Sequence, residues 1–163
     1  MRYIRALILL ATLVLPAKSA IANVLNLADY QSFYDLNLNM LPIGDNLYAL
    51  TARQPKAQGP NCVIDLALKF DAVKADLRNI GTLVGIAASM TDSADESRVI
   101  RYLSVVAWEF LEQLKYHRLT LNSIVGSCTE DDAVAKSQEI SRNWSDAASL
   151  VHSIVKKIGA NPP

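Results

Sequence analysis

The fold is decided by residues 62–128, which read CVIDLALKFDAVKADLRNIGTLVGIAASM over 62–90 and TDSADESRVIRYLSVVAWEFLEQLKYHRLTLNSIVGSC over 91–128. In both halves apolar residues recur at alternating spacings of three and four, the pattern of a helix that packs one face against its neighbours. The first apolar seam is Val63, Leu66, Phe70, Val73, Leu77, Ile80, Val84 and Ala87; the second is Val99, Leu103, Val106, Phe110, Leu114, His117 and Leu121. This stretch predicts two long helices, over about 62–90 and 94–125.

The connection between these two helices is short and polar. Thr91, Asp92 and Ser93 have the side chains of a turn, and Ser93 followed by Glu96 fits a capping box that would start the second helix. Helices joined by so short a connection run antiparallel. Residues 62–128 therefore predict a helical hairpin, with Cys62 and Cys128 together at its open end.

Residues 1–22 resemble a secretory signal peptide. Arg2 and Arg5 precede an apolar run from Ala6 to Leu15, and residues 20–22 form an A-x-A-like cleavage site. The run is too short to span a bilayer as a helix, although an uncleaved membrane anchor is the alternative. We therefore expect an exported product, periplasmic or secreted, whose first residue is Asn23.

Export bears directly on the two cysteines, because oxidising compartments favour disulfide formation. We expect Cys62 and Cys128 to be joined, with two free buried cysteines as the alternative. A disulfide that closes a loop of about 65 residues would stabilise the fold by roughly 4 kcal/mol in the chain-entropy treatment.

Two further segments flank the hairpin. Residues 130–158 predict a third long helix, which Gly159 ends. Residues 23–60 predict short helices interrupted at Pro42 and Gly44, followed by a loop rich in proline and glycine; a mobile N-terminal segment is the alternative. The expected fold is an all-α antiparallel bundle of three long helices over 61–163, with a broken N-terminal helical layer in the same single domain.

Charge and hydropathy exclude two classes of partner. Removing Arg2, Arg5 and Lys18 from the 16 basic residues leaves 13 against 16 acidic ones, a net charge of about −3. No basic cluster is present, so the electrostatic signature of a nucleic-acid-binding protein is missing. After signal cleavage no apolar run is long enough for a membrane span.

No catalytic, metal or cofactor motif stands out. His117 and His152 are the only histidines, and the predicted topology separates them by roughly 20 Å along the bundle. Neither has the glutamate three residues earlier that di-metal carboxylate bundles require. Met90 and His152 are conceivable haem ligands, but no C-x-x-C-H attachment motif accompanies them. Glu109 and Glu112 belong to a charged surface face, so we expect no enzyme and no cofactor.

The end of the hairpin opposite the cysteines has more apolar surface than one interface needs. Three arrangements would cover it: the N-terminal layer, another subunit, or a ligand in an apolar cavity. Gly81-x-x-x-Gly85 in this region permits a close helix approach, which we expect inside the bundle. The candidate interaction or ligand region comprises Met90, Trp108, Trp144 and His152, with Tyr30, Phe33 and Tyr34 of the N-terminal layer as a seal or a partner site.

These observations favour a non-enzymatic exported protein that works by protein–protein interaction. Its partner would be another exported protein, or a second copy of the chain bound through the apolar end. The alternative function is a periplasmic carrier or sensor of a small apolar ligand held between helices.

Overall fold

The computed structural model describes residues 24–53, 62–127 and 131–161. They form four α-helices: α1 (Leu27–Arg53), α2 (Cys62–Ser89), α3 (Ser93–Ser127) and α4 (Asp131–Lys157). The described residues contain no strand, so the all-α prediction is confirmed. The three long helices begin and end within a few residues of their expected positions.

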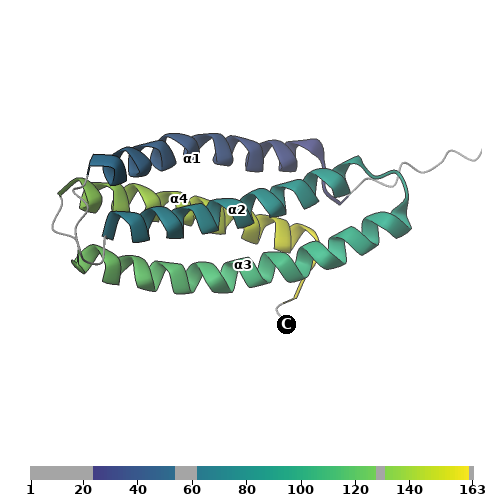
Figure 1. The fold of residues 1–163 in the computed structure, drawn as a ribbon. Helices are drawn as coiled ribbons and strands as arrows, with labels where there is room; N and C mark the ends of the chain where they lie inside the picture. Colours follow the sequence, from purple (N-terminus) through teal and green to yellow (C-terminus); the bar gives the residue numbers. More distant parts are fainter. Residues whose placement is uncertain (1–23, 54–61, 128–130, 162–163) are drawn as a thin grey trace, which may run out of the picture.

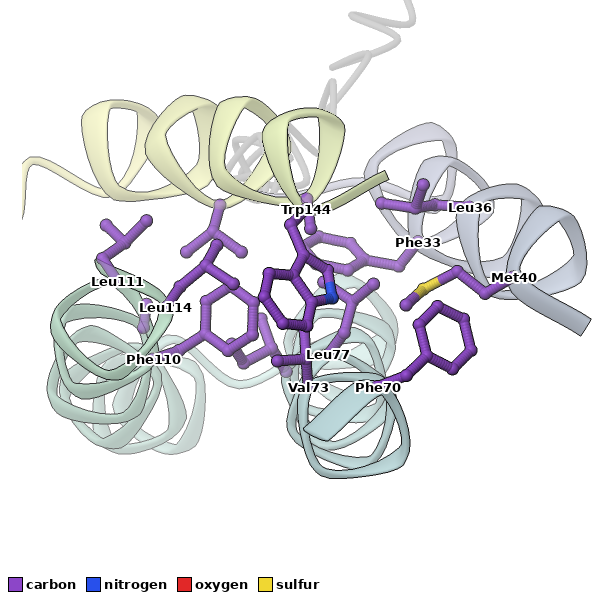
Figure 2. Packing of buried hydrophobic residues seen from close by; sticks show 14 of the residues in the cluster. Phe33, Leu36, Met40, Phe70, Val73, Leu77, Phe110, Leu111, Leu114 and Trp144 are labelled. Atoms are coloured by element: carbon purple, nitrogen blue, oxygen red, sulfur yellow. The ribbon is translucent and has the colours of Figure 1, made fainter. Parts of the chain in front are cut away.

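Successive helices run antiparallel (Figure 1), and their buried side chains form one apolar core. α2 and α4 each pack against both α1 and α3 and also touch each other, which leaves α1 and α3 at opposite corners of the bundle. Aromatic side chains from all four helices meet along this core (Figure 2). Its largest fully buried members include Trp144, Phe33, Phe70, Met40 and Leu77.

The expectation of a broken N-terminal layer is wrong, because α1 is one continuous helix of 27 residues that contains Pro42. A proline inside a helix loses one backbone hydrogen bond and costs about 3 kcal/mol. Pro42 and Leu38, whose carbonyl loses its donor, are both exposed, so water can hydrate that carbonyl. Met40 and Ile43 on the opposite side are completely or almost completely buried. Each such burial contributes about 1.5–3 kcal/mol, so the two together match or exceed the cost of the proline.

The start of α1 is fixed by a reciprocal capping box. Asn26 Oδ1 accepts the backbone N–H of Ala28 at 2.9 Å, and Asp29 Oδ2 accepts the backbone N–H of Asn26 at 2.7 Å. Asp29 also forms an ion pair with Lys157 in the last turn of α4, at 2.7 Å. One carboxylate therefore both caps α1 and joins it to the C-terminal end of α4.

The capping box predicted for Ser93 and Glu96 is wrong. Asp92 caps α3 instead, because its Oδ1 accepts the backbone N–H of Ala94 at 2.7 Å. Glu96 is 5% exposed, and its Oε1 accepts the backbone N–H of Val24 at 3.1 Å. This side chain therefore holds the segment before α1 against α3, where Leu25 is completely buried.

The end of α4 follows the sequence prediction. Gly159 has a φ of 64°, a left-handed conformation that glycine adopts without steric cost. Its N–H donates to the carbonyl of Lys156, and the N–H of Ala160 donates to the carbonyl of Val155. These two bonds are those of a Schellman motif, so Gly159 ends the helix as expected.

Three sequence predictions concern residues outside the described ranges. They are the signal peptide over 1–22, the proline- and glycine-rich loop that follows α1, and the cysteine at position 128. Cys62 is the first residue of α2 and is half-buried. The Cys62–Cys128 disulfide and the single-domain organisation therefore stay predictions.

Candidate interaction surface on α1 and α2

α1 is apolar on two sides. One side faces the core with Phe33, Leu36, Met40, Ile43 and Leu47, and we call it the inner face. A second line of large apolar side chains, spaced by three, four or seven residues, follows the solvent side of the helix. This outer stripe consists of Leu27, Tyr30, Tyr34, Leu38, Leu41 and Tyr48, whose side chains are between 38% and 69% exposed.

The outer stripe borders a groove between α1 and α2. One hollow, of about 390 Å³, is lined by Tyr30, Phe33, Tyr34, Asn37, Leu38 and Leu41 of α1 and by Lys74, Arg78, Gly81 and Thr82 of α2. A second hollow is lined by Leu27, Tyr30, Thr82, Gly85, Ile86 and Ser89. Tyr30 and Thr82 line both, so the two hollows are adjacent, and together we call them the α1–α2 groove.

Two glycines of α2 allow α1 to lie this close. A Cβ atom at Gly81 would stand 2.9 Å from Cβ of Phe33, and one at Gly85 would stand 2.8 Å from Cδ2 of Tyr30. Both distances are shorter than real Cβ contacts, so the predicted close approach through Gly81-x-x-x-Gly85 inside the bundle is confirmed.

The α2 wall of the groove carries positive charge. Lys74 and Arg78 lie four residues apart, on the same side of the helix, and both line the groove. Neither is in an ion pair with any of the residues that the structure describes. Farther along, the Tyr48 hydroxyl donates a hydrogen bond to the Asp71 carboxylate. This bond raises the pKa of Tyr48, as does the negative charge of Asp71, so the hydroxyl stays a protonated donor.

The structure divides the predicted interaction region. Trp108 of α3 meets His152 of α4 edge to face, with ring centroids 6.2 Å apart. Trp144 is completely buried, and its ring centroid lies 6.1 Å from that of His117. Met90 is half-buried, directly after α2.

The predicted aromatic residues of α1 lie elsewhere. Phe33 is almost completely buried, whereas Tyr30 and Tyr34 are exposed beside the groove. Because α1 and α3 occupy opposite corners, Tyr30 and Tyr34 form no common site with Trp108.

His117, which belongs to the predicted seam of α3, is half-buried. Its Nδ1 is buried without a hydrogen-bond partner among the described residues. Burial lowers the pKa of His117, the nearby charge of Lys69 lowers it further, and Asp76 opposes both. The imidazole is therefore held toward its neutral form.

Neither a metal centre nor a membrane span is found where the structure describes the chain. Residues 24–53, 62–127 and 131–161 contain no group of three or more potential metal ligands. Over those same ranges, no helix combines the length and the apolar run that crossing a bilayer would require.

Comparisons with protein-family models, with curated proteins and with solved structures each found no match.

Sequence reasoning did not identify Leu27, Leu38 and Leu41 of the outer stripe as site residues, nor the basic pair Lys74 and Arg78. The signal was present: residues 27, 34, 41 and 48 form a heptad series separate from the series that contains the inner face. A linear pattern does not show which side of a helix meets its neighbours, so it does not tell which of the two series stays exposed.

Proposed function

We propose that this protein is a non-enzymatic helical-bundle protein that binds another protein through the outer stripe of α1 and the α1–α2 groove. The observation that supports it is the outer stripe, which remains exposed although the inner face of the same helix completes the core. Monomeric soluble proteins rarely expose a long contiguous apolar surface, and where they do it usually marks an interaction site.

The composition of this surface also suits an interface. Three of the six side chains in the outer stripe are tyrosines, which combine a large apolar area with a hydrogen-bonding tip. Aromatic residues are enriched among the side chains that dominate binding energy. The groove beside them offers a concave site into which a partner side chain can be inserted.

The predicted export and disulfide belong to the same proposal. α2 begins at Cys62, and α3 ends at Ser127, one residue before Cys128. These two helix ends lie at the same end of the bundle (Figure 1). A disulfide there would hold α2 against α3 in an oxidising compartment, where the protein would meet an exported partner.

The alternative of a carrier for a small apolar ligand has less support. Trp144, one of the residues of the candidate interaction or ligand region, is completely buried in the core. The α1–α2 groove is open to solvent along side chains that are themselves exposed, whereas carriers of apolar ligands bury most of the ligand surface.

The test compares two matched substitutions. Leu38→Glu places a charge in the outer stripe, and Val105→Glu places the same charge at an exposed apolar position of α3. The wild-type chain and each variant, carrying a photo-crosslinker at Asn37, are expressed in the native host. We expect one adduct to form with wild type and Val105→Glu and to be lost with Leu38→Glu. Equal adduct yields from all three chains would contradict the proposal.

A further inference from the structure

We infer that the partner inserts an amphipathic helix into the α1–α2 groove, with its apolar stripe against α1 and an acidic flank facing Lys74 and Arg78 of α2. This inference rests on the proposed function and specifies the chemistry of the partner. The juxtaposition that carries it is an apolar wall on α1 opposite a basic wall on α2.

The shape of the groove suits a helix. Its walls are two long antiparallel helices, and its lining on α2 extends from Lys74 to Ser89. At ~1.5 Å per residue this is roughly 22 Å, or about four helical turns. In the middle of that wall Thr82 contributes only a short side chain, and Phe33 and Tyr30 of α1 lie over Gly81 and Gly85. Helices that bind in such grooves insert apolar residues at every third or fourth position.

Charge gives the bound helix an orientation around its axis. The residues of α1 that line the groove include no charged side chain, so the α1 wall offers no counter-charge. The α2 wall presents Lys74 and Arg78, for which the described residues supply no ion pair. Carboxylates on the flank that faces α2 would supply the missing counter-charges, and complementary charge both steers encounter and discriminates between partners.

The same charges disfavour a second copy of this chain as the occupant. A two-fold antiparallel pairing of outer stripes would centre between Tyr34 and Leu41. In the antiparallel register of α1 and α2, Phe33 lies beside Gly81 and Gly44 lies beside Phe70. The centre of such a dimer interface would therefore lie beside the part of α2 that runs from Lys74 to Arg78. Two lysines and two arginines would then converge across the interface, and like charges brought together there are repulsive.

The experiment uses three fluorescent helical peptides of about 18 residues with an identical leucine stripe. The flank beside the stripe is glutamate in the first peptide, glutamine in the second and lysine in the third. Fluorescence anisotropy measures the Kd of each peptide for the wild-type chain, for Leu38→Glu and for the double variant Lys74→Glu/Arg78→Glu. Circular dichroism establishes that both variants keep the helical content of wild type.

At low ionic strength we expect the glutamate peptide to bind wild type roughly five- to tenfold more tightly than the glutamine peptide, as expected for two exposed charge pairs. The preference should shrink at 1 M salt, where the Debye length is about 3 Å. The double variant should reverse the order and favour the lysine peptide.

Several results would overturn the inference. Equal Kd values for the three peptides, or an unchanged order with the double variant, would show that the basic wall does not select the partner. If Leu38→Glu nevertheless abolished binding of all three, the outer stripe would still be an interaction site and only the acidic flank would be wrong. No binding of any peptide would exclude a helical occupant, and a concentration-dependent dimer lost with Leu38→Glu would identify a second copy instead.

Discussion

The inner face and the outer stripe of α1 belong to one helix and have similar apolar character, yet they differ in what covers them. Phe33 on the inner face is 1% exposed, whereas Tyr34, the next residue, is 49% exposed. The difference arises because α2 and α4 close over one side of α1 only. The inner face therefore supports the fold, and the outer stripe is available for binding.

The first prediction is a large difference in stability between alanine variants of these two adjacent aromatics. Phe33→Ala should destabilise the fold by about 3–5 kcal/mol, because it removes a buried ring and leaves a cavity. Tyr34→Ala should change the unfolding free energy by less than about 0.5 kcal/mol, as is usual at the surface. Urea denaturation of the two variants measures both values. A comparable loss in Tyr34→Ala would mean that the outer stripe is part of the core.

The second prediction concerns the depth at which α1 sits on α2. Gly81→Ala should cost about 1–3 kcal/mol, because the new methyl group meets Cβ of Phe33, which is fixed to the backbone. Gly85→Ala meets the ring edge of Tyr30, which is 38% exposed and can rotate outward. The gain of about 1 kcal/mol from replacing glycine in a helix then offsets most of its cost. Thermal unfolding of both variants checks this order, and equal losses would mean that Tyr30 is held as firmly as Phe33.

The third prediction concerns Asp29, which caps α1 and joins it to α4. Asp29→Ala removes a helix cap and the ion pair to Lys157, and we expect a loss of about 1–2 kcal/mol. Asp95→Ala is the matched control, since it removes an exposed ion pair with Arg98 within one helix. Its cost should stay below about 0.5 kcal/mol. If chemical denaturation gave similar losses of unfolding free energy for the two variants, the ion pair between α1 and α4 would add no stability.

The smallest expected effect is a pH dependence from His117. Burial lowers its pKa in the folded state, so the unfolded chain takes up a proton first as the pH falls. Stability is then complete above the ordinary histidine pKa of about 6.5 and declines as the pH falls through the lowered folded value. His117→Gln should reduce this decline, measured as the midpoint of thermal unfolding between pH 7.5 and 5. His152→Gln is the control variant. If the midpoint of His117→Gln fell with pH as steeply as that of wild type, the pH dependence would not come from His117.

Much of the fold was readable from local pattern. The seams from Val63 to Ala87 and from Val99 to Leu121 predicted α2 and α3, because packing requires apolar residues on one side of a helix. Gly159 predicted the end of α4, because a left-handed residue is needed there. These features depend on residues within a few positions of one another, so a single sequence contains them.

Other features depend on partners distant in the chain. Asp29 reaches Lys157, and Glu96 holds the backbone of Val24, and neither pairing leaves a local signal. The continuity of α1 through Pro42 follows from tertiary burial that offsets a local cost. Local propensity therefore predicts an interruption at Pro42, although the folded chain continues the helix through it.

The apolar content of α1 and the close approach that Gly81 and Gly85 allow could both be predicted from residue type. The division of the aromatics between two sides, with Phe33 covered by α2 and Tyr34 left beside the groove, could not. The physical reason is that periodicity gives the angle between side chains around one helix. Which angle faces the core is set by the packing of the other three helices.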